Sequence, residues 1–293
     1  MMVEAPEEIL IHKQTTLARS VTLEGIGLHT GRPARVTLDP AEANTGIVFR
    51  CAGVEFPART QYVASTTRCT VLGSEGVQVQ TVEHLLSALF GLEVDNLRVV
   101  VEGSELPALD GSALPWVQAI MDAGIVCLRE PRMLPTLTMP LVVHQNGSWM
   151  IAVPATHPTL TCVTHFDHPL LGTQVSVYDS TTDSYASMIA PARTFGFIEE
   201  VEALAHAGLA RGGSLENALI VFSDGFSSPE RLDQECNRHK LLDLMGDLML
   251  TGCRPPASIT AIRPSHSANV LLADTLAQHL SIHPTKETLN AGR

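Results

Sequence analysis

Two stretches of the sequence combine titratable side chains with a run of apolar residues. In the first, "QTVEHLLSAL" (80–89), Glu83 and His84 stand side by side at the expected start of a helix. Thr81 is a candidate N-cap, and an acid in a first helical turn complements the helix dipole. For this stretch alone, an ordinary structural role is therefore the simpler interpretation.

The second stretch, "NRHKLLDLMGDLML" (237–250), is expected to form a helix that is apolar on nearly all sides. Such a helix is normally buried, yet this one carries His239, Asp243 and Asp247 at intervals of four, which places them on one face. A buried carboxylate is costly unless a cation or hydrogen-bond donors meet it. A divalent metal held by His239 and Asp243 would meet that need. The alternative is a His–Asp hydrogen bond with a distant Arg or Lys as partner.

Taken together, His84, His239 and Asp243 offer two imidazoles and one carboxylate, all of which are ligands that Zn²⁺ accepts. Three protein ligands leave a coordination position for water, which is the pattern of a catalytic rather than a structural site. Glu83, beside one ligand, could then serve as a general base for that water. The arrangement differs from the H-E-x-x-H motif of metalloproteases because the acid precedes the first histidine.

Other residues could complete such a site, and each also has an ordinary interpretation. His266 precedes an expected helix capped by Ser267, and it could be a solvated loop residue or a second catalytic group. Asp247 could orient that histidine. Thr194 in "APARTFGF" could polarise a carbonyl or simply form a strand-end turn. Lys240 could contact an anionic ligand or remain solvated on its helix.

Glycines provide additional local signals. Gly246 lies inside the expected helix at a cost of about 1 kcal/mol relative to alanine, which suggests that another element packs closely there. The stretch "GIGLHTGRP", with His29, is too loose for a dinucleotide fingerprint and favours a hairpin turn. Asp110 and Gly111 indicate a turn, with Ser112 as a cap for the following helix.

Each half of the chain is expected to contain several strands, a helix, a strand and a second helix. In the first half, the pattern predicts strands at 19–25, 32–40, 46–50, 68–73 and 96–103, and helices at 82–90 and 113–124. In the second half, it predicts strands at 134–143, 148–154, 159–166, 173–179, 217–222 and 257–263, and helices at 229–251 and from about 267. The shared order predicts two α+β domains, each a mostly antiparallel sheet with helices on one face. We place the boundary in the junction 127–137, which gives domains 1–130 and 131–293.

The bulk composition limits the classes of protein to consider. Of the 293 residues, 45% are hydrophobic and 17% are charged, which is typical of a soluble globular protein with a sizeable core. A net charge of −12 argues against a nucleic-acid-binding protein, whose affinity rests on phosphate neutralisation. No apolar run reaches the roughly 18–20 residues that span a bilayer, and the acidic N-terminal stretch does not resemble a signal peptide. Six cysteines without a C-x-x-C pair fit reduced thiols rather than a disulfide framework, so we expect a cytoplasmic protein.

Six motifs, in this order along the chain, resemble those of one enzyme family. They are "GIGLHTG", "TVEHLLSALFGLEVDN", "ELPALDGSA", "ARTFGF", "RHKLLDLMGDL" and "HSAN", and the resemblance extends from about Gln14 to His279. The set resembles the UDP-3-O-acyl-N-acetylglucosamine deacetylases, the zinc enzymes of bacterial lipid A synthesis. The departures are a slightly extended N-terminus, loops of different length, and variation around the His and Asn of "HSAN". None falls on the candidate metal ligands, and the acyl-chain preference stays open.

The resemblance implies a role for each candidate residue. It implies zinc on His84, His239 and Asp243, with Fe²⁺ as an alternative ion in the cell, and Glu83 as the general base. The other implied site residues are His266 as the second catalytic group, Asp247 as its support, Thr194 at the metal site, and Lys240, Phe195 and Gly196 at the substrate. The implied fold has two α+β domains facing each other, with the active site between them.

The implied reaction removes the N-acetyl group of an acylated UDP-sugar. We therefore expect a small-molecule substrate, no nucleic-acid partner, no transmembrane segment, at most peripheral membrane contact, and a monomer. The amphipathic segment 196–213, "GFIEEVEALAHAGLARGG", is interpreted as part of a groove for the acyl chain, with ordinary domain core as the alternative.

Two other functions are consistent with the residues. One is a different zinc hydrolase that acts on another small amide. The other is a non-catalytic module with a structural metal, which would need a fourth protein ligand, and the sequence offers no obvious residue for that place.

Overall fold

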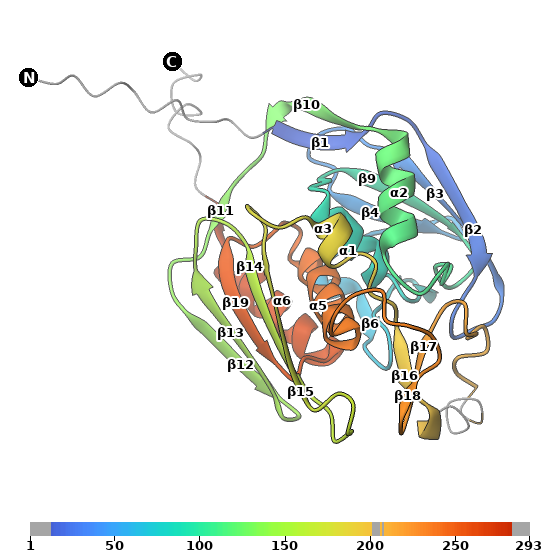
Figure 1. Ribbon diagram of the computed structural model, residues 1–293. Helices are drawn as coiled ribbons and strands as arrows, with labels where there is room; N and C mark the ends of the chain where they lie inside the picture. The colour runs from blue at the N-terminus through green and yellow to red at the C-terminus, as the bar shows by residue number, and fades with distance from the viewer. Residues whose placement is uncertain (1–12, 201–205, 207, 283–293) are drawn as a thin grey trace, which may run out of the picture.

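Two five-stranded sheets form the outer layers of the molecule, and helices fill the space between them (Figure 1). This computed structural model describes residues 13–200, 206 and 208–282. In hydrogen-bonded order, the first sheet consists of β2 (Val21–Ile26), β3 (Pro33–Pro40), β9 (Leu97–Glu102), β4 (Ile47–Cys51) and β5 (Val54–Pro57). The second sheet consists of β12 (Leu141–Gln145), β13 (Ser148–Pro154), β19 (Ala257–Ile262), β14 (Thr159–His165) and β15 (Thr173–Asp179).

The two sheets have the same topology. The strands β2, β3, β9, β4 and β5 take the places in the first sheet that β12, β13, β19, β14 and β15 take in the second. Each sheet contains one parallel pair, β4 with β9 and β14 with β19, and its other pairs are antiparallel. The predicted fold class, two similar and mostly antiparallel α+β units, is therefore confirmed. The residue at which one unit gives way to the other stays a prediction.

The helices repeat in the same chain order. In the first half, α1 (Glu83–Gly91) precedes β9 and α2 (Leu114–Ala123) follows it. In the second half, α5 (Glu235–Leu248) precedes β19 and α6 (His266–His279) follows it. Figure 1 shows α1 and α5 side by side in the middle of the molecule, and their residues belong to one continuous hydrophobic core. This packing brings the N-terminal turn of α1 from one half against the face of α5 from the other.

Smaller elements complete each half. Two three-stranded sheets are formed by β6 (Val63–Ser65), β7 (Val71–Ser74) and β8 (Val77–Val79), and by β16 (Phe195–Phe197), β17 (Leu219–Phe222) and β18 (Gly225–Phe226). Two-stranded sheets pair β1 (Lys13–Leu17) with β10 (Ile125–Pro131), and β11 (Pro135–Thr136) with β20 (Ser281–Ile282). Other elements whose bounds lie within the described residues are α3 (Tyr185–Met188) and the 3₁₀ turns η1 (Thr60–Tyr62) and η2 (Met249–Thr251).

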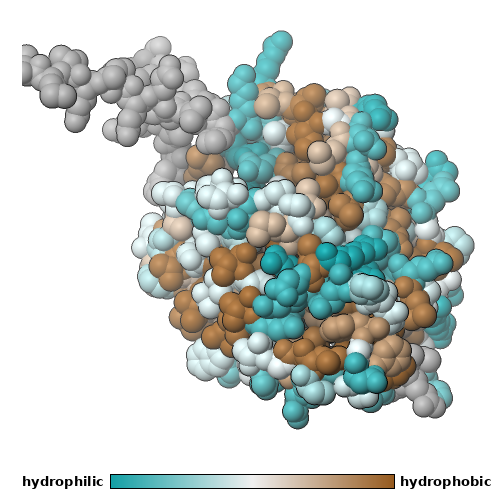
Figure 2. All heavy atoms as spheres, in the orientation of Figure 1, coloured by the Kyte–Doolittle hydropathy of each residue, from teal (hydrophilic) through white to brown (hydrophobic). Residues whose placement is uncertain are grey.

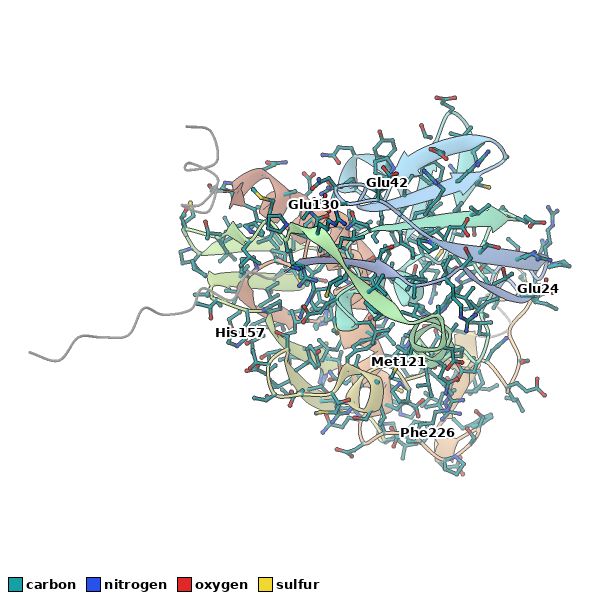
Figure 3. The ribbon with its side chains drawn as sticks, turned by 90° about the horizontal axis from the view of Figure 1, so that it is seen from above. Glu24, Glu42, Met121, Glu130, His157 and Phe226 are labelled. Carbon is teal, nitrogen blue, oxygen red and sulfur yellow. The ribbon has the colours of Figure 1, made fainter. Side chains whose placement is uncertain are left out.

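The surface alternates between hydrophobic and hydrophilic residues in small patches on the face shown in Figure 2. Seen from above, Glu24 of β2 and Met121 of α2 lie on the outside of the first half (Figure 3). No helix within residues 13–200, 206 and 208–282 has both the length and the apolar character needed to cross a membrane. All six cysteine thiols, each in the described part of the chain, are free.

The start of α1 differs from the prediction. Thr81 is not the N-cap, because the helix begins one residue later, after Val82. Instead, Thr81 has a left-handed φ of 59°, and its hydroxyl donates a hydrogen bond to the buried carboxylate of Glu105 at 3.0 Å. The sharp backbone turn at Thr81 places Glu83 at the first helical position.

The starts of α5 and α6 also differ from the predictions. The predicted start of α5 near residue 229 is wrong, because Gln234 adopts a left-handed conformation with a φ of 55° and the helix begins only after it. The cap of α6 is Ser265 rather than Ser267, and its Oγ accepts a hydrogen bond from the Ala268 N–H. Both differences depend on backbone conformations at single residues, to which hydrophobic patterning is insensitive.

The close approach expected at Gly246 is present. A Cβ added to this glycine would lie 2.1 Å from the backbone oxygen of Glu83, where α1 crosses α5. Backbone atoms at that distance have to move, because the contact cannot be relieved by a side-chain rotation. The glycine therefore determines how closely the two helices approach.

We expect Gly246→Ala to destabilise the fold although alanine is the better helix former. The gain in helix propensity is about 1 kcal/mol, whereas overpacking a buried site costs typically ~1–3 kcal/mol, occasionally more, and here the neighbour is backbone. Urea unfolding should show a lower midpoint for this variant. A matched control is Gly225→Ala, because a Cβ at Gly225 meets no atom within 4 Å. Equal stability of the Gly246 variant and the wild type would contradict the packing described.

Candidate metal centre

Three side chains from the two halves converge where α1 meets α5. His84 lies in the first turn of α1, and His239 and Asp243 lie one turn apart on α5. The Asp243 Oδ1 is 3.4 Å from the Nε2 of His239 and 3.8 Å from the Nε2 of His84. All three residues are buried, and their ligand atoms lie within 4.8 Å of one another. The predicted set of three is therefore brought together.

These separations fit one shared ion. A tetrahedral Zn²⁺ with ligand bonds of ~2.0–2.2 Å keeps neighbouring ligand atoms about 3.4 Å apart, and the two nitrogen–oxygen distances are 3.4 and 3.8 Å. The rings of His84 and His239 are nearly perpendicular, at 86°, with centroids 5.0 Å apart. Both rings thus present one nitrogen edge to the same carboxylate.

The protonation states of the three residues also suit a metal. Burial, together with the neighbouring His239, lowers the pKa of His84 to about 3. Burial likewise lowers the pKa of His239. Burial alone would raise the pKa of Asp243, but the Lys240 ammonium and the neighbouring histidines lower it well below its usual range. Two neutral imidazoles and one carboxylate are the forms in which these side chains bind metals.

The second ring nitrogen of His239 is also engaged. Its Nδ1–H donates to the backbone carbonyl of Ala192 at 3.0 Å. Such a bond fixes the tautomer and the ring orientation, and it leaves the Nε2 lone pair available to a metal ion. Ala192 was not a candidate from the sequence, because a backbone carbonyl carries no residue-type signal.

A second group of titratable side chains lies directly beside the first. The Nε2 of His266 is 3.8 Å from the Oε1 of Glu83 and 4.0 Å from the Oδ2 of Asp243. Burial raises the pKa of Glu83 to about 8, an effect that Asp243 and Asp247 strengthen and His266 opposes. Burial alone would lower the pKa of His266, but Asp247 and the other two carboxylates raise it to about 9. The arrangement favours a cationic imidazole next to a carboxyl group that titrates near neutral pH.

Asp247 holds His266 in place, as the sequence suggested. Its Oδ2 lies 3.0 Å from the Nδ1 of His266 and also accepts a hydrogen bond from the Asn269 side chain at 2.9 Å. Its Oδ1 accepts the hydroxyl of Thr70 at 2.5 Å. The backbone N–H of Thr70 in turn donates to the Oε2 of Glu83 at 3.1 Å. Thr70 and Asn269 therefore belong to the site.

Neither Thr70 nor Asn269 was predicted to contact Asp247. Asn269 could have been found, since it follows His266 by three residues and so shares a helix face with it. Thr70 lies in the stretch "RCTVLG", which was predicted only as a strand, and nothing in its spacing links it to the distant Asp247.

The site opens onto a cavity of 620 Å³ lined by both halves of the chain. Its lining includes Glu83, His266 and the three candidate metal ligands. The second half also contributes Thr194, Phe195, Gly196 and Lys240, and the first half contributes Leu28, His29 and Arg68. Lys240 donates from its Nζ to the Oδ2 of Asp243 at 2.9 Å and lies 5.7 Å from the ring centre of Phe195. All the predicted site residues thus face this cavity or support those that do.

Only part of the segment 196–213, which was predicted to form an acyl-chain groove, lies within the described residues. From segment 196–213, the residues Ile198, Ala210 and Gly213 line the cavity beside Gly196. Residues 201–205 and 207, which include Leu204, lie outside the described residues. A larger cavity of 770 Å³ lies between the halves near Arg132 and Arg254, and among the described residues it contains no set of three metal-ligating groups.

Comparison with known proteins gives one consistent result. A family model described as LpxC, UDP-3-O-acyl N-acetylglycosamine deacetylase, matches residues 14–278. A protein from Thermosynechococcus vestitus with the name UDP-3-O-acyl-N-acetylglucosamine deacetylase is 41% identical over 278 residues, which cover 93% of this chain and 97% of the relative. Proteins with the same name from a Nostoc species and from Syntrophotalea carbinolica are 40% and 38% identical, covering 90% and 87% of this chain and 98% and 85% of the relatives. With a family match over most of its length and a repeated fold that unites the motif residues in one site, the chain belongs to the UDP-3-O-acyl-N-acetylglucosamine deacetylase family.

Proposed function

We propose that this chain is a zinc-dependent deacetylase that hydrolyses the N-acetyl group of UDP-3-O-acyl-N-acetylglucosamine in lipid A biosynthesis. The products are acetate and UDP-3-O-acyl-glucosamine. The observation that carries the proposal is the convergence of His84 with His239 and Asp243, from different halves of the chain, beside Glu83. Fe²⁺ is an alternative ion, since imidazole and carboxylate ligands suit several divalent metals.

The metal would be held by His84, His239 and Asp243. When bound, it supplies a Lewis acid that polarises a carbonyl group and lowers the pKa of a coordinated water. Glu83 accepts a proton from the attacking water, and its pKa near neutrality suits a group that takes up a proton and then returns it. As water oxygen bonds to the acetyl carbon, the hydroxyl of Thr194 donates a hydrogen bond to the oxygen that gains negative charge.

The second half of the reaction breaks the C–N bond. The leaving nitrogen becomes an amine and needs a proton, which His266 donates as a cation or Glu83 returns. Asp247, held by Thr70 and Asn269, keeps His266 protonated and oriented. Acetate and a free amine result, with every proton accounted for by water and these two side chains.

The remaining lining residues would bind the substrate. Lys240 provides a positive charge at the cavity wall for an anionic substrate, and Phe195 and Gly196 provide surface beside it. The described part of segment 196–213 offers apolar atoms for the acyl chain. We expect the chain to act as a cytoplasmic monomer. Its contact with a membrane should be at most peripheral, because its substrate carries a single acyl chain.

The direct experiment is incubation of the purified protein with UDP-3-O-acyl-N-acetylglucosamine, followed by mass spectrometry of the product. We expect the loss of one acetyl group and the appearance of acetate. A panel of simple acetamides provides the comparison, because a zinc hydrolase of another specificity would turn those over instead. No loss of acetyl from the UDP-sugar by the metal-loaded protein would overturn the proposal.

A further inference from the structure

A buried ion pair joins the start of α5 to the coil that precedes β16. Arg193 is 5% exposed and Glu235 is fully buried. The Nε of Arg193 donates to Glu235 Oε1 at 2.7 Å, and one terminal nitrogen donates to Oε2 at 2.9 Å. The backbone N–H of Arg193 also donates to Oε1, at 2.9 Å. The pair is thus held by both the side chain and the main chain of the arginine.

The remaining polar atoms of the pair are also satisfied. The guanidinium donates to the Ser228 hydroxyl at 2.7 Å and to the Pro229 carbonyl at 2.9 Å. Glu235 accepts a further hydrogen bond from the backbone N–H of Arg231 at 2.7 Å. A buried ion pair is weak evidence for stability by itself, since an apolar pair of similar volume is often as stable. A network this complete instead fixes the geometry of the segments that it joins.

Those segments are the two that form the hydrogen bond to the metal ligand His239. Ala192, whose carbonyl accepts the Nδ1–H of His239, immediately precedes Arg193. On α5, Glu235 lies four residues before His239, which is one helical turn. The ion pair therefore connects the coil that carries the Ala192 carbonyl to the helix α5 that carries His239.

The coil that carries Ala192 has no sheet partner at that point, because β16 begins only at Phe195. After the ion pair, the next described anchor along the coil is Thr194, whose N–H donates to Gly111 and whose carbonyl accepts from Leu219. On the other side, the Ala192 N–H donates to the Ile189 carbonyl at 3.0 Å. Without the ion pair, the coil between that turn and Thr194 would lose its hydrogen-bonded anchor at Arg193, the residue next to the Ala192 carbonyl. Loss of a group that hydrogen-bonds to a metal ligand typically weakens metal affinity by about 10–100-fold.

We propose that Arg193 and Glu235 are positioning residues, which hold the Ala192 carbonyl against His239 and so raise the affinity of the site for its metal. The inference rests on the proposed metal site and adds two residues that neither bind the ion nor line the cavity. A purely structural role would affect the stability of the fold and leave metal affinity unchanged at temperatures well below unfolding.

The test compares Zn²⁺ affinity, measured by competition with a chelator at 25 °C, in the full-length wild type and in Glu235→Gln. This variant keeps the size of the side chain and removes its charge. We expect its dissociation constant for Zn²⁺ to rise about 10-fold or more. Arg193→Lys, which keeps the charge but loses the bidentate fork, should shift affinity in the same direction by less, and it decides the question if Glu235→Gln fails to fold.

A second ion pair provides the matched control. Arg132 binds Asp95 through its Nε and a terminal nitrogen, at 3.0 and 2.9 Å, and both residues line the other cavity rather than the one beside His84, His239 and Asp243. Asp95→Asn should lower the melting temperature and leave Zn²⁺ affinity within twofold of wild type. Affinities equal to wild type in Glu235→Gln and Arg193→Lys would overturn the inference. Failure of the wild type to bind Zn²⁺ would overturn the proposed function instead.

Discussion

Replacing Glu83 by alanine lowers kcat by roughly 100-fold or more and leaves the metal in place. The expected size is that of a missing general base. Glu83 is 2% exposed and lies 3.8 Å from His266. It stands outside the proposed ligand set of His84, His239 and Asp243, although it forms a second possible metal-binding group with Asp243 and His266. Under the proposed assignment, its loss should affect proton transfer rather than ion binding. Steady-state kinetics on the acylated UDP-sugar, together with metal analysis of the same preparation, provide the measurement.

Two further variants sharpen this test. Glu83→Gln keeps an oxygen that can still accept the Thr70 N–H, so it removes the base while preserving the local packing. Glu102→Gln changes an exposed carboxylate on β9 and should retain full activity. Turnover of Glu83→Gln close to that of Glu102→Gln would remove Glu83 from the mechanism.

Asp243→Ala is expected to lose the metal itself. Among the described residues, the Asp243 side chain is the one carboxylate within 4 Å of both His84 and His239, and it supplies the negative charge of the proposed ligand set. Because partners outside the ligand set already change affinity by about 10–100-fold, removal of a ligand should weaken binding by more than about 100-fold. Elemental analysis after dialysis should show a nearly metal-free protein with little activity.

The control for this variant is Asp233→Ala, an exposed acid in the turn before the same helix. It should retain one metal per chain. Full occupancy in Asp243→Ala would contradict the ligand assignment. The loss of Asp243 also leaves Lys240 without its 2.9 Å partner, so a thermal melt should accompany the metal analysis to show that the variant is folded.

The residues that we propose as metal ligands could be predicted because their types and spacing carry a physical signal. His239 and Asp243 recur at four-residue intervals on an otherwise apolar helix, and buried charges of that kind need a partner. Gly246 was similarly informative. A glycine inside a helix lowers helix stability relative to alanine, and close packing of another helix is a reason for it to be there. His84 could be added to His239 and Asp243 as a third candidate ligand because it stands beside an acid, Glu83, in another stretch of the chain.

The supporting residues were harder to predict for identifiable reasons. Ala192 acts through its carbonyl and Thr70 through contacts to residues far along the chain, and neither effect leaves a local pattern. The positions of Thr81 and Gln234 in the left-handed region depend on single backbone angles. These decide where α1 and α5 begin, which is why the predicted helix starts were the least accurate part of the fold.

The repeated topology explains how distant residues meet. Each half supplies one helix at the same place in the chain order, α1 before β9 and α5 before β19, and packing the halves together brings these two helices into contact. The strand pattern predicted the repeat, but not the side on which the halves join. The residues that meet there therefore depend on tertiary packing, with Gly246 at the crossing.

The most direct test of this account is anomalous X-ray diffraction at the zinc edge on crystals of the metal-loaded protein. We predict one anomalous peak within bonding distance of His84 Nε2, His239 Nε2 and a carboxylate oxygen of Asp243, open to the cavity beside Glu83. A peak at another place, or an ion enclosed by a fourth protein ligand, would contradict it.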